Sequence, residues 1–201
     1  MNELPPQTRV AFQGEHGAFS EDAAVKLLGP GIRLVPRPTF AALFSSLAEG
    51  LADYALAPVE NSLVGAIQPA VDLLEASSLV VAGEIVIEIR QQLIGCPGAV
   101  FEEIEAVESH PAALAQCQRF FAEHPSLARI ETEDTAGSVA RIIECGDRKR
   151  AAIAGRRAAE IYGGCVIKEN VEDDPENYTR FLLLAKLGMQ ASCLPAKWPR
   201  T

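Results

Sequence analysis

Strand patterns alternate with helix patterns along most of this chain of 201 residues, and this alternation limits the folds that it can adopt. Short apolar runs indicate strands, and apolar residues at three- and four-residue spacings indicate helices. The first strands are expected at 9–13, 32–35 and 54–57, with helices between them that are capped by Ser20 and Thr39. This order of elements is typical of a parallel sheet covered by helices.

A second cycle of the same kind begins at Ala106. Its strands are expected at 106–108, 129–132, 151–154 and 166–171, and its helices open at Pro111, at Asp134 and Thr135, and at Arg156. The helix at Pro111 is expected to run to Phe120. Between the two cycles, residues 83–95 read as one alternating strand that is long enough to leave one sheet and join another.

Two similar cycles favour two α/β lobes, and one doubly wound sheet is the alternative. The first lobe is expected to contain residues 1–80 and, because the last strand returns to it, residues from about 173 to about 190. The second lobe is expected to span residues 83–172. Residues 187–201 mix Pro, Gly, Lys and Trp without periodicity, and an irregular tail is expected there.

The balance of charges excludes one large class of partners. The formal net charge is −9, whereas a protein that binds nucleic acid needs a basic surface for the phosphates. No apolar run approaches the ~18 residues of a membrane span, and the polar residues 1–8 lack the pattern of a signal peptide. We therefore expect a cytoplasmic protein that binds neither nucleic acid nor a membrane.

The cysteines and histidines indicate no cofactor. The five cysteines include no Cys-x-x-Cys pair, which fits a reducing compartment without disulfides or a zinc site. Cys117 follows Ala113 and Leu114 on an expected helix face and reads as a packed residue instead of a nucleophile. The three histidines are scattered, and the glycine-rich motifs of nucleotide-binding proteins are absent from the sequence. We expect no metal and no cofactor.

Polar residues follow four of the expected strands, at the ends where α/β proteins bind ligands. They occupy positions 13–17, 60–62, 109–110 and 134–137. Each group precedes an expected helix and would offer free backbone N–H groups and the positive end of a helix dipole. Each group alone reads as an ordinary helix cap. Several groups that converge on one cleft would form a polar pocket for a carboxylate ligand.

A hydroxyl and a guanidinium stand at the entrance of the last apolar run. Thr179 and Arg180 directly precede residues 181–184, which read as a buried strand. Ligand chemistry in α/β proteins is commonly placed at such a strand entrance. The alternative is a polar strand entrance without a chemical role.

Five stretches, taken together and in order, resemble the catalytic domain of prephenate dehydratases. They are residues 14–20, 58–65, 109–117, 134–138 and 177–181, and residues 151–163 add a sixth. The resemblance covers the chain from Arg9 to about Lys186. Each motif is weak alone, whereas five motifs in the family's order are specific.

The resemblance implies decarboxylative dehydration of prephenate to phenylpyruvate, in phenylalanine biosynthesis. It also implies two lobes around a cleft, similar to a type 2 periplasmic binding protein, and a homodimer. Thr179 corresponds to the threonine that the family requires for catalysis. The substrate-binding residues that the resemblance implies are Glu60, Asn61, Ser62, Ser109, His110, Gln116, Thr135, Ala136, Asn177, Arg180 and Phe181.

The chemistry of prephenate gives Thr179 a specific task. Loss of carbon dioxide and hydroxide creates an aromatic ring, so the enzyme must orient the substrate and assist the departing hydroxyl group. We hypothesise that Thr179 donates a hydrogen bond or a proton to that oxygen, although a threonine hydroxyl is a weak acid that needs help from its neighbours. Arg180 either contacts a carboxylate or braces the loop, and Phe181 is expected to serve packing.

Three other functions stay open. Arogenate, the amino analogue of prephenate, could be the substrate on the same scaffold, and a related decarboxylase that does not form an aromatic ring is conceivable. The third is a non-catalytic protein that binds a small anion, because a fold does not fix a function. Only about 15 residues follow Lys186, too few for a domain, so we expect no regulatory ACT domain.

Overall fold

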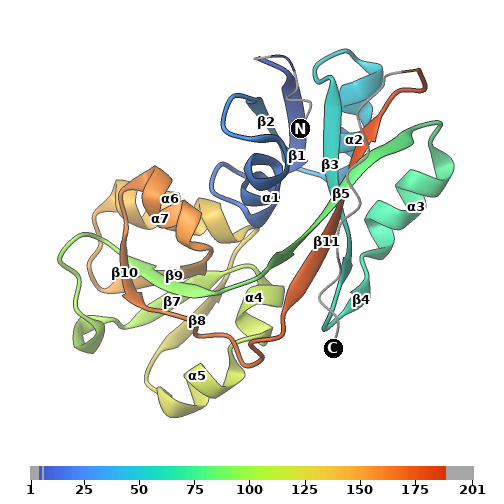
Figure 1. Ribbon diagram of the computed structural model, residues 1–201. Helices are drawn as coiled ribbons and strands as arrows, with labels where there is room; N and C mark the ends of the chain where they lie inside the picture. The colour runs from blue at the N-terminus through green and yellow to red at the C-terminus, as the bar shows by residue number, and fades with distance from the viewer. Residues whose placement is uncertain (1–4, 6, 189–201) are drawn as a thin grey trace. The chain divides into compact units, whose positions relative to one another are not determined.

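The computed structural model describes residue 5 and residues 7–188, which divide into two compact α/β units (Figure 1). The first unit contains the described residues up to Gly14, residues 20–88, and those from Asn177 onward. The second contains Glu15–Phe19 and Ile89–Glu176. Each unit has its own sheet, which confirms the two-lobed α/β fold and excludes one doubly wound sheet. Most of the expected irregular tail lies outside the described residues.

The sheet of the first unit mixes parallel and antiparallel strands in the order β2-β1-β3-β11-β5. Its strands are β1 (Arg9–Gln13), β2 (Arg33–Arg37), β3 (Tyr54–Asn61), β4 (Gly65–Ala66), β5 (Val80–Glu88) and β11 (Tyr178–Ala185). β1 is parallel to β2 and β3, whereas β11 runs antiparallel to both β3 and β5, and β4 pairs only with β3. β11, the last of the described strands, therefore lies inside this sheet, between β3 and β5.

Helices α1 (Phe19–Leu28), α2 (Phe40–Ala48) and α3 (Gln68–Ala76) connect these strands. Thr39 caps α2 as predicted, because its side chain accepts a hydrogen bond from the Ala42 backbone N–H at 3.1 Å. The apolar spacing of α2 then buries Leu43, Phe44 and Leu47 against the sheet. The core of the first unit thus lies between α2, α3 and the strands β1, β3 and β11.

The second unit has a five-stranded sheet in the order β10-β6-β9-β7-β8. Its strands are β6 (Gln92–Gly95), β7 (Ala106–Ser109), β8 (Ala128–Glu131), β9 (Arg150–Ala154) and β10 (Cys165–Lys168), and its helices are η1 (Phe101–Glu103), α4 (Pro111–Ala115), α5 (Gln118–Glu123), α6 (Thr135–Cys145) and α7 (Arg156–Tyr162). β7 is parallel to β8 and β9, whereas β6 runs antiparallel to β9 and β10.

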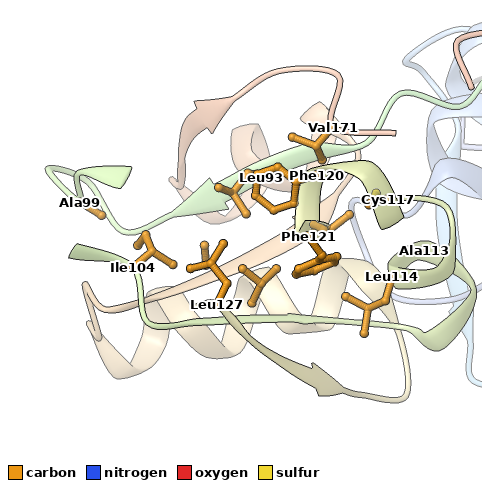
Figure 2. Close-up of a cluster of buried hydrophobic side chains, with 13 residues drawn as sticks. Leu93, Ala99, Ile104, Ala113, Leu114, Cys117, Phe120, Phe121, Leu127 and Val171 are labelled. Atoms are coloured by element: carbon orange, nitrogen blue, oxygen red, sulfur yellow. The ribbon is translucent and has the colours of Figure 1, made fainter. Parts of the chain in front are cut away.

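A cluster of buried apolar side chains fills one face of this second sheet (Figure 2). Phe120 and Phe121 of α5 contact each other edge to face, with ring centroids 5.2 Å apart. Leu93 of β6 and Cys117 belong to the same cluster, and both are fully buried. Burial raises the pKa of the Cys117 thiol to about 12, so this cysteine is a packed, protonated residue, as the sequence indicated.

The expected strand at 83–95 is two strands in two different sheets. β5 ends at Glu88 in the first unit and β6 begins at Gln92 in the second, so the stretch does leave one sheet and join another. The division between the units consequently falls after Glu88, later in the chain than the expected boundary near residue 83.

The expected helix from Pro111 to Phe120 is broken into α4 and α5. The cause is Asp173, which lies far along the chain. Its carboxylate accepts hydrogen bonds from the backbone N–H groups of Gln118 and Arg119, each at 2.8 Å, and so caps a new helix start. Its own N–H donates to the Gln116 carbonyl, which is thereby taken out of the helix.

Residues 15–19 pack in the second unit, although the sequence placed them after the first strand of the first lobe. Gly17 has a φ of +87°, and a Cβ atom on it would lie 2.7 Å from the Cα atom of Ala158. The Tyr162 hydroxyl donates to the carbonyl of His16 at 2.8 Å. Because α1 already begins at Phe19, Ser20 is a residue of the helix and not its cap.

Candidate active site

The segment Glu60–Ser62 was expected between a strand and a helix, and this expectation is wrong. Glu60 and Asn61 are the last two residues of β3, and Ser62 begins the turn to β4. Pairing with β11 extends the strand beyond its apolar part, since Asn61 lies opposite Thr179 in the ladder. The Ser62 N–H donates to the Tyr178 carbonyl at 2.9 Å. These backbone groups belong to the sheet and its turn, so they offer no helix N-terminus to a ligand.

The side chain of Asn61 is the centre of a buried hydrogen-bond network in the first unit. Its Oδ1 atom accepts from the backbone N–H groups of Leu63 and Val64, at 3.0 and 3.2 Å. Its Nδ2 atom donates to the Tyr178 carbonyl, 3.0 Å away. Backbone N–H groups can only donate and a carbonyl can only accept, so these three contacts fix which end of the Asn61 amide is oxygen.

Two further acceptors lie against the same Asn61 Nδ2 atom. The Asn177 Oδ1 atom is 2.7 Å away and the Thr179 Oγ1 atom is 3.0 Å away. Asn177 is fully buried, and Asn61 and Thr179 are 6% and 7% exposed. Hydrogen bonds in such a buried place are stronger than in water, because the local dielectric is low.

The network determines what the Thr179 hydroxyl can do. Its oxygen accepts a hydrogen bond from the Asn61 amide, so its own proton has to point elsewhere. Within residues 7–188, no hydrogen-bond partner of this oxygen is found besides Asn61. The proton of this hydroxyl therefore has no acceptor among the described residues and can be donated to a bound ligand.

An irregularity in the sheet lies beside Thr179. Arg180 pairs with Glu60 and Phe181 pairs with Pro58, so Val59 of β3 is an extra residue in the ladder. β-bulges of this kind bend a strand and redirect side chains, and they are common next to active sites. Phe181, which follows the bulge, is 2% exposed and points into the core.

The Arg180 guanidinium is held by carboxylates of the neighbouring strands. Its Nε atom donates to Glu84 Oε2 at 2.9 Å, and its Nη2 atom donates to the same oxygen. Its Nη1 atom lies 3.8 Å from Glu60 Oε2. Of the two uses expected for Arg180, these contacts favour bracing of the strands.

The other predicted site residues belong to the second unit. The buried Ser109 hydroxyl donates to the Ile153 carbonyl at 2.6 Å, and the His110 Nδ1 atom accepts from the Ala112 N–H as the cap of α4. Gln116 Oε1 accepts from Gln91 Nε2 at 3.4 Å. Thr135 and Ala136 form the first turn of α6, which Asp134 caps as predicted. Ser109 and His110 thus stand at the end of β7, Gln116 caps the end of α4, and Thr135 and Ala136 begin α6.

Local sequence patterns do not indicate which residues the side chains of the site contact. Glu84, the partner of Arg180, lies in an alternating strand like any other surface carboxylate. Such patterns also do not predict that the Oε1 atoms of the buried Gln91 and Gln92 have no hydrogen-bond partner among the described residues. Among the described residues, no cluster of three or more His, Cys, Asp or Glu side chains could hold a metal ion. In the same part of the chain, every helix is too short or too polar to cross a membrane.

The chain is a two-lobed α/β protein with one sheet in each lobe. The buried pair of Thr179, at the start of β11, and Asn61, at the end of β3, marks a candidate active site in its first unit. A family model for prephenate dehydratase matches residues 10–188. The chain belongs to the prephenate dehydratase family.

Curated relatives from a plant and a bacterium match most of the chain. Arogenate dehydratase/prephenate dehydratase 2 of Arabidopsis thaliana is 39% identical over 180 residues, which cover 90% of this chain and 47% of the relative. The bifunctional chorismate mutase/prephenate dehydratase of Neisseria gonorrhoeae is 38% identical over 176 residues, which cover 87% of this chain and 49% of the relative. The chain spans about half the length of these relatives.

Solved structures share the fold. The prephenate dehydratase of Arthrobacter aurescens, in complex with L-Phe, has a TM-score of 0.81 at 28% identity, over 94% of this chain and 63% of that one. A protein described as a novel type of quorum quenching acylase has a TM-score of 0.80 at 32% identity, over 90% of this chain and 65% of that one.

Proposed function

We propose that this chain catalyses the decarboxylating dehydration of prephenate to phenylpyruvate, in L-phenylalanine biosynthesis. Membership of the prephenate dehydratase family supports the reaction class. The single observation that carries the mechanism is the hydrogen bond from Asn61 Nδ2 to Thr179 Oγ1, which leaves the Thr179 proton for a substrate.

The reaction needs a donor at one oxygen atom. The bond between the ring and its carboxylate breaks and releases carbon dioxide, while its electron pair enters the ring. The C–O bond at the opposite ring carbon then breaks, and the departing oxygen takes a proton and leaves as water. Thr179 supplies that proton or a hydrogen bond at this oxygen, and solvent restores the threonine hydroxyl afterwards.

The same contact argues against nucleophilic attack by Thr179, the step by which a threonine ester would form in acyl transfer. A hydroxyl nucleophile needs a neighbouring base that accepts its proton. The neighbour of Thr179 is the Nδ2 end of Asn61, which donates instead of accepting. The polarity of this pair suits donation to a leaving group, so we retain dehydration as the function.

For substrate binding we propose roles for other residues of the predicted set. Asn177, Ser62 and Glu60 lie in the same unit as Thr179. Within the second unit, Thr135 and Ala136 in the first turn of α6 stay predicted contacts of a carboxylate. Ser109, His110 and Gln116 stay as predicted contacts. The Arg180 guanidinium and the Phe181 ring, by contrast, are engaged in the strands and in the core. A homodimer stays a prediction.

Arogenate is the second candidate substrate, because the Arabidopsis thaliana relative is named for both arogenate and prephenate dehydratase activity. The two substrates differ in the side chain, where one has a keto group and the other an ammonium group. The assay follows phenylpyruvate or phenylalanine from purified protein with each substrate, and compares kcat/KM. Turnover of prephenate with the higher kcat/KM supports the proposal, and no turnover of either substrate at micromolar enzyme would refute it.

A further inference from the structure

We infer that Asn61 is a positioning residue that acts through Thr179, instead of a residue that binds the substrate. The inference rests on the proposed function, since it assigns the source of the donor strength of Thr179. Every polar atom of the Asn61 side chain is already engaged: two backbone N–H groups donate to Oδ1, and the two N–H groups of Nδ2 are shared among three acceptors. The amide therefore has no group left for a ligand.

The first task of Asn61 is to set the direction of the Thr179 proton. A free threonine hydroxyl rotates and can donate to any nearby acceptor. The Asn61 N–H occupies a lone pair of Thr179 Oγ1, so rotation toward Asn61 brings no hydrogen bond. The proton consequently favours a direction away from the network, toward the group that it serves.

The second task is to stabilise charge on the Thr179 oxygen. When the hydroxyl gives its proton to a leaving group, negative charge grows on Oγ1. An N–H group that already points at that atom stabilises this charge, and it does so strongly because both side chains are buried. This arrangement explains how a weak acid can assist the departure of hydroxide.

Asn177 and the turn after β3 keep the Asn61 amide in this orientation. The Asn177 Oδ1 atom and the Tyr178 carbonyl accept from the nitrogen end, and the N–H groups of Leu63 and Val64 hold the oxygen end. A reversed amide would place its oxygen against two acceptors and its nitrogen against two donors. The amide is therefore locked in place by four groups other than Thr179.

The decisive variant is Asn61→Asp. Its carboxylate keeps the two bonds from Leu63 and Val64, so the turn is retained. Its second oxygen would face Thr179 Oγ1 and draw the threonine proton to itself. Because it would also stand against the Asn177 and Tyr178 acceptors, urea unfolding of this variant is measured beside its kinetics. We expect kcat on prephenate to fall by about 100-fold or more at neutral pH, with KM changed less than about threefold. We also expect kcat of this variant alone to recover as the pH falls, because protonation of Asp turns it from an acceptor into a donor.

A double-mutant cycle separates positioning from general damage. Asn61→Ala should lower kcat by about 10- to 100-fold in the wild-type background, and by less than about twofold when Thr179→Ala is already present. Ser46→Ala is the matched control in the same unit. The Ser46 hydroxyl is fully buried, accepts from Arg37 Nε at 2.7 Å and donates to the Ala42 carbonyl. Its loss should lower the thermal midpoint but leave kcat unchanged.

The outcomes distinguish this inference from the proposed function. Wild-type protein that does not turn over prephenate or arogenate refutes the function. Active wild type with an inactive Thr179→Ala variant, but with Asn61 variants that keep kcat or raise only KM, refutes the positioning role alone. Equal loss of kcat from Asn61→Ala in both backgrounds would refute it as well, because the residue would then act independently of Thr179.

Discussion

Arg180 and Glu84 are diagonal neighbours on the adjacent antiparallel strands β11 and β5, where two N–H groups of the guanidinium donate to one carboxylate oxygen. Arg180 directly follows Thr179 in the chain. The side chains are 38% and 22% exposed, so the pair is accessible to water and to salt. Ion pairs of this kind contribute at most about 1 kcal/mol to stability.

We predict that Glu84→Gln and Arg180→Gln have similar, modest effects, because each removes the same brace. Each variant should lower kcat/KM for prephenate less than about tenfold and the free energy of unfolding by up to about 1 kcal/mol. Steady-state kinetics and urea unfolding measure the two effects. A large rise in KM for Arg180→Gln without a matching rise for Glu84→Gln would show that the arginine binds the substrate.

Thr179 should tolerate only replacements that keep a hydroxyl. Thr179→Ser retains the donor and appreciable activity, whereas Thr179→Val keeps the shape but removes the hydroxyl, which is one of the three acceptors around Asn61 Nδ2. We expect Thr179→Val to lower kcat by about two orders of magnitude or more, as for loss of a general acid. Single-turnover measurements with saturating prephenate report this step. A valine variant with near wild-type kcat contradicts the role of the hydroxyl.

Gly17 and Gly29 form a matched pair for the effect of added volume. Both have a positive φ, +87° and +85°, but a Cβ atom would strike the backbone of Ala158 at Gly17 and would meet open space at Gly29. Gly29→Ala should destabilise by about 1–2 kcal/mol through its backbone conformation. Gly17→Ala should lower the free energy of unfolding by roughly a further 1–3 kcal/mol, because the added methyl group overpacks this site. Denaturant unfolding measures the stability of both variants. Equal losses of stability would contradict the close approach of Gly17 to Ala158.

Asp53 should make the first unit sensitive to acid. A side-chain hydrogen bond from Arg9 lowers the pKa of the Asp53 carboxyl below its usual value, against the opposing effect of burial. A lowered pKa in the folded state means that the stabilisation is complete above the ordinary pKa and disappears as the pH falls through the lowered one. The effect is small, because both side chains are about one-third exposed, 36% and 33%.

Asp53→Asn therefore provides a direct comparison. Between pH 6 and pH 3, the variant should lose less stability than the wild type in urea unfolding experiments. At high salt the difference between the two proteins should shrink, since the ions screen the pair. Parallel pH profiles for both proteins would show that Asp53 makes no such contribution.

The order of elements was predictable because it depends on local patterns. Thr39 and Asp134 cap their helices as expected, and each of these caps is made within four residues. The errors arise where distant residues intervene. Asp173 breaks the helix that follows Pro111, and β11 extends β3 through Glu60 and Asn61. A local sequence pattern cannot show partners that lie so far away in the chain as Asp173 and β11.

The candidate site was predictable to a similar degree. The resemblance selected Thr179, Asn61 and Asn177, which the structure brings into one network. The resemblance does not indicate which atoms touch, so it implies a substrate-binding role for Asn61. Atom-level roles depend on the pairing of strands that lie more than a hundred residues apart in the chain, and only the folded sheet shows them.

The position of β11 between β3 and β5 also sets an order of events during synthesis. Apart from residues 15–19, the second unit is one uninterrupted segment that leaves the ribosome before β11 does. Until then, β3 and β5 lack the strand that joins them and expose backbone groups that could pair with another chain. The second unit can therefore complete its sheet first, and Thr179 arrives with β11, the strand that completes the sheet of the first unit.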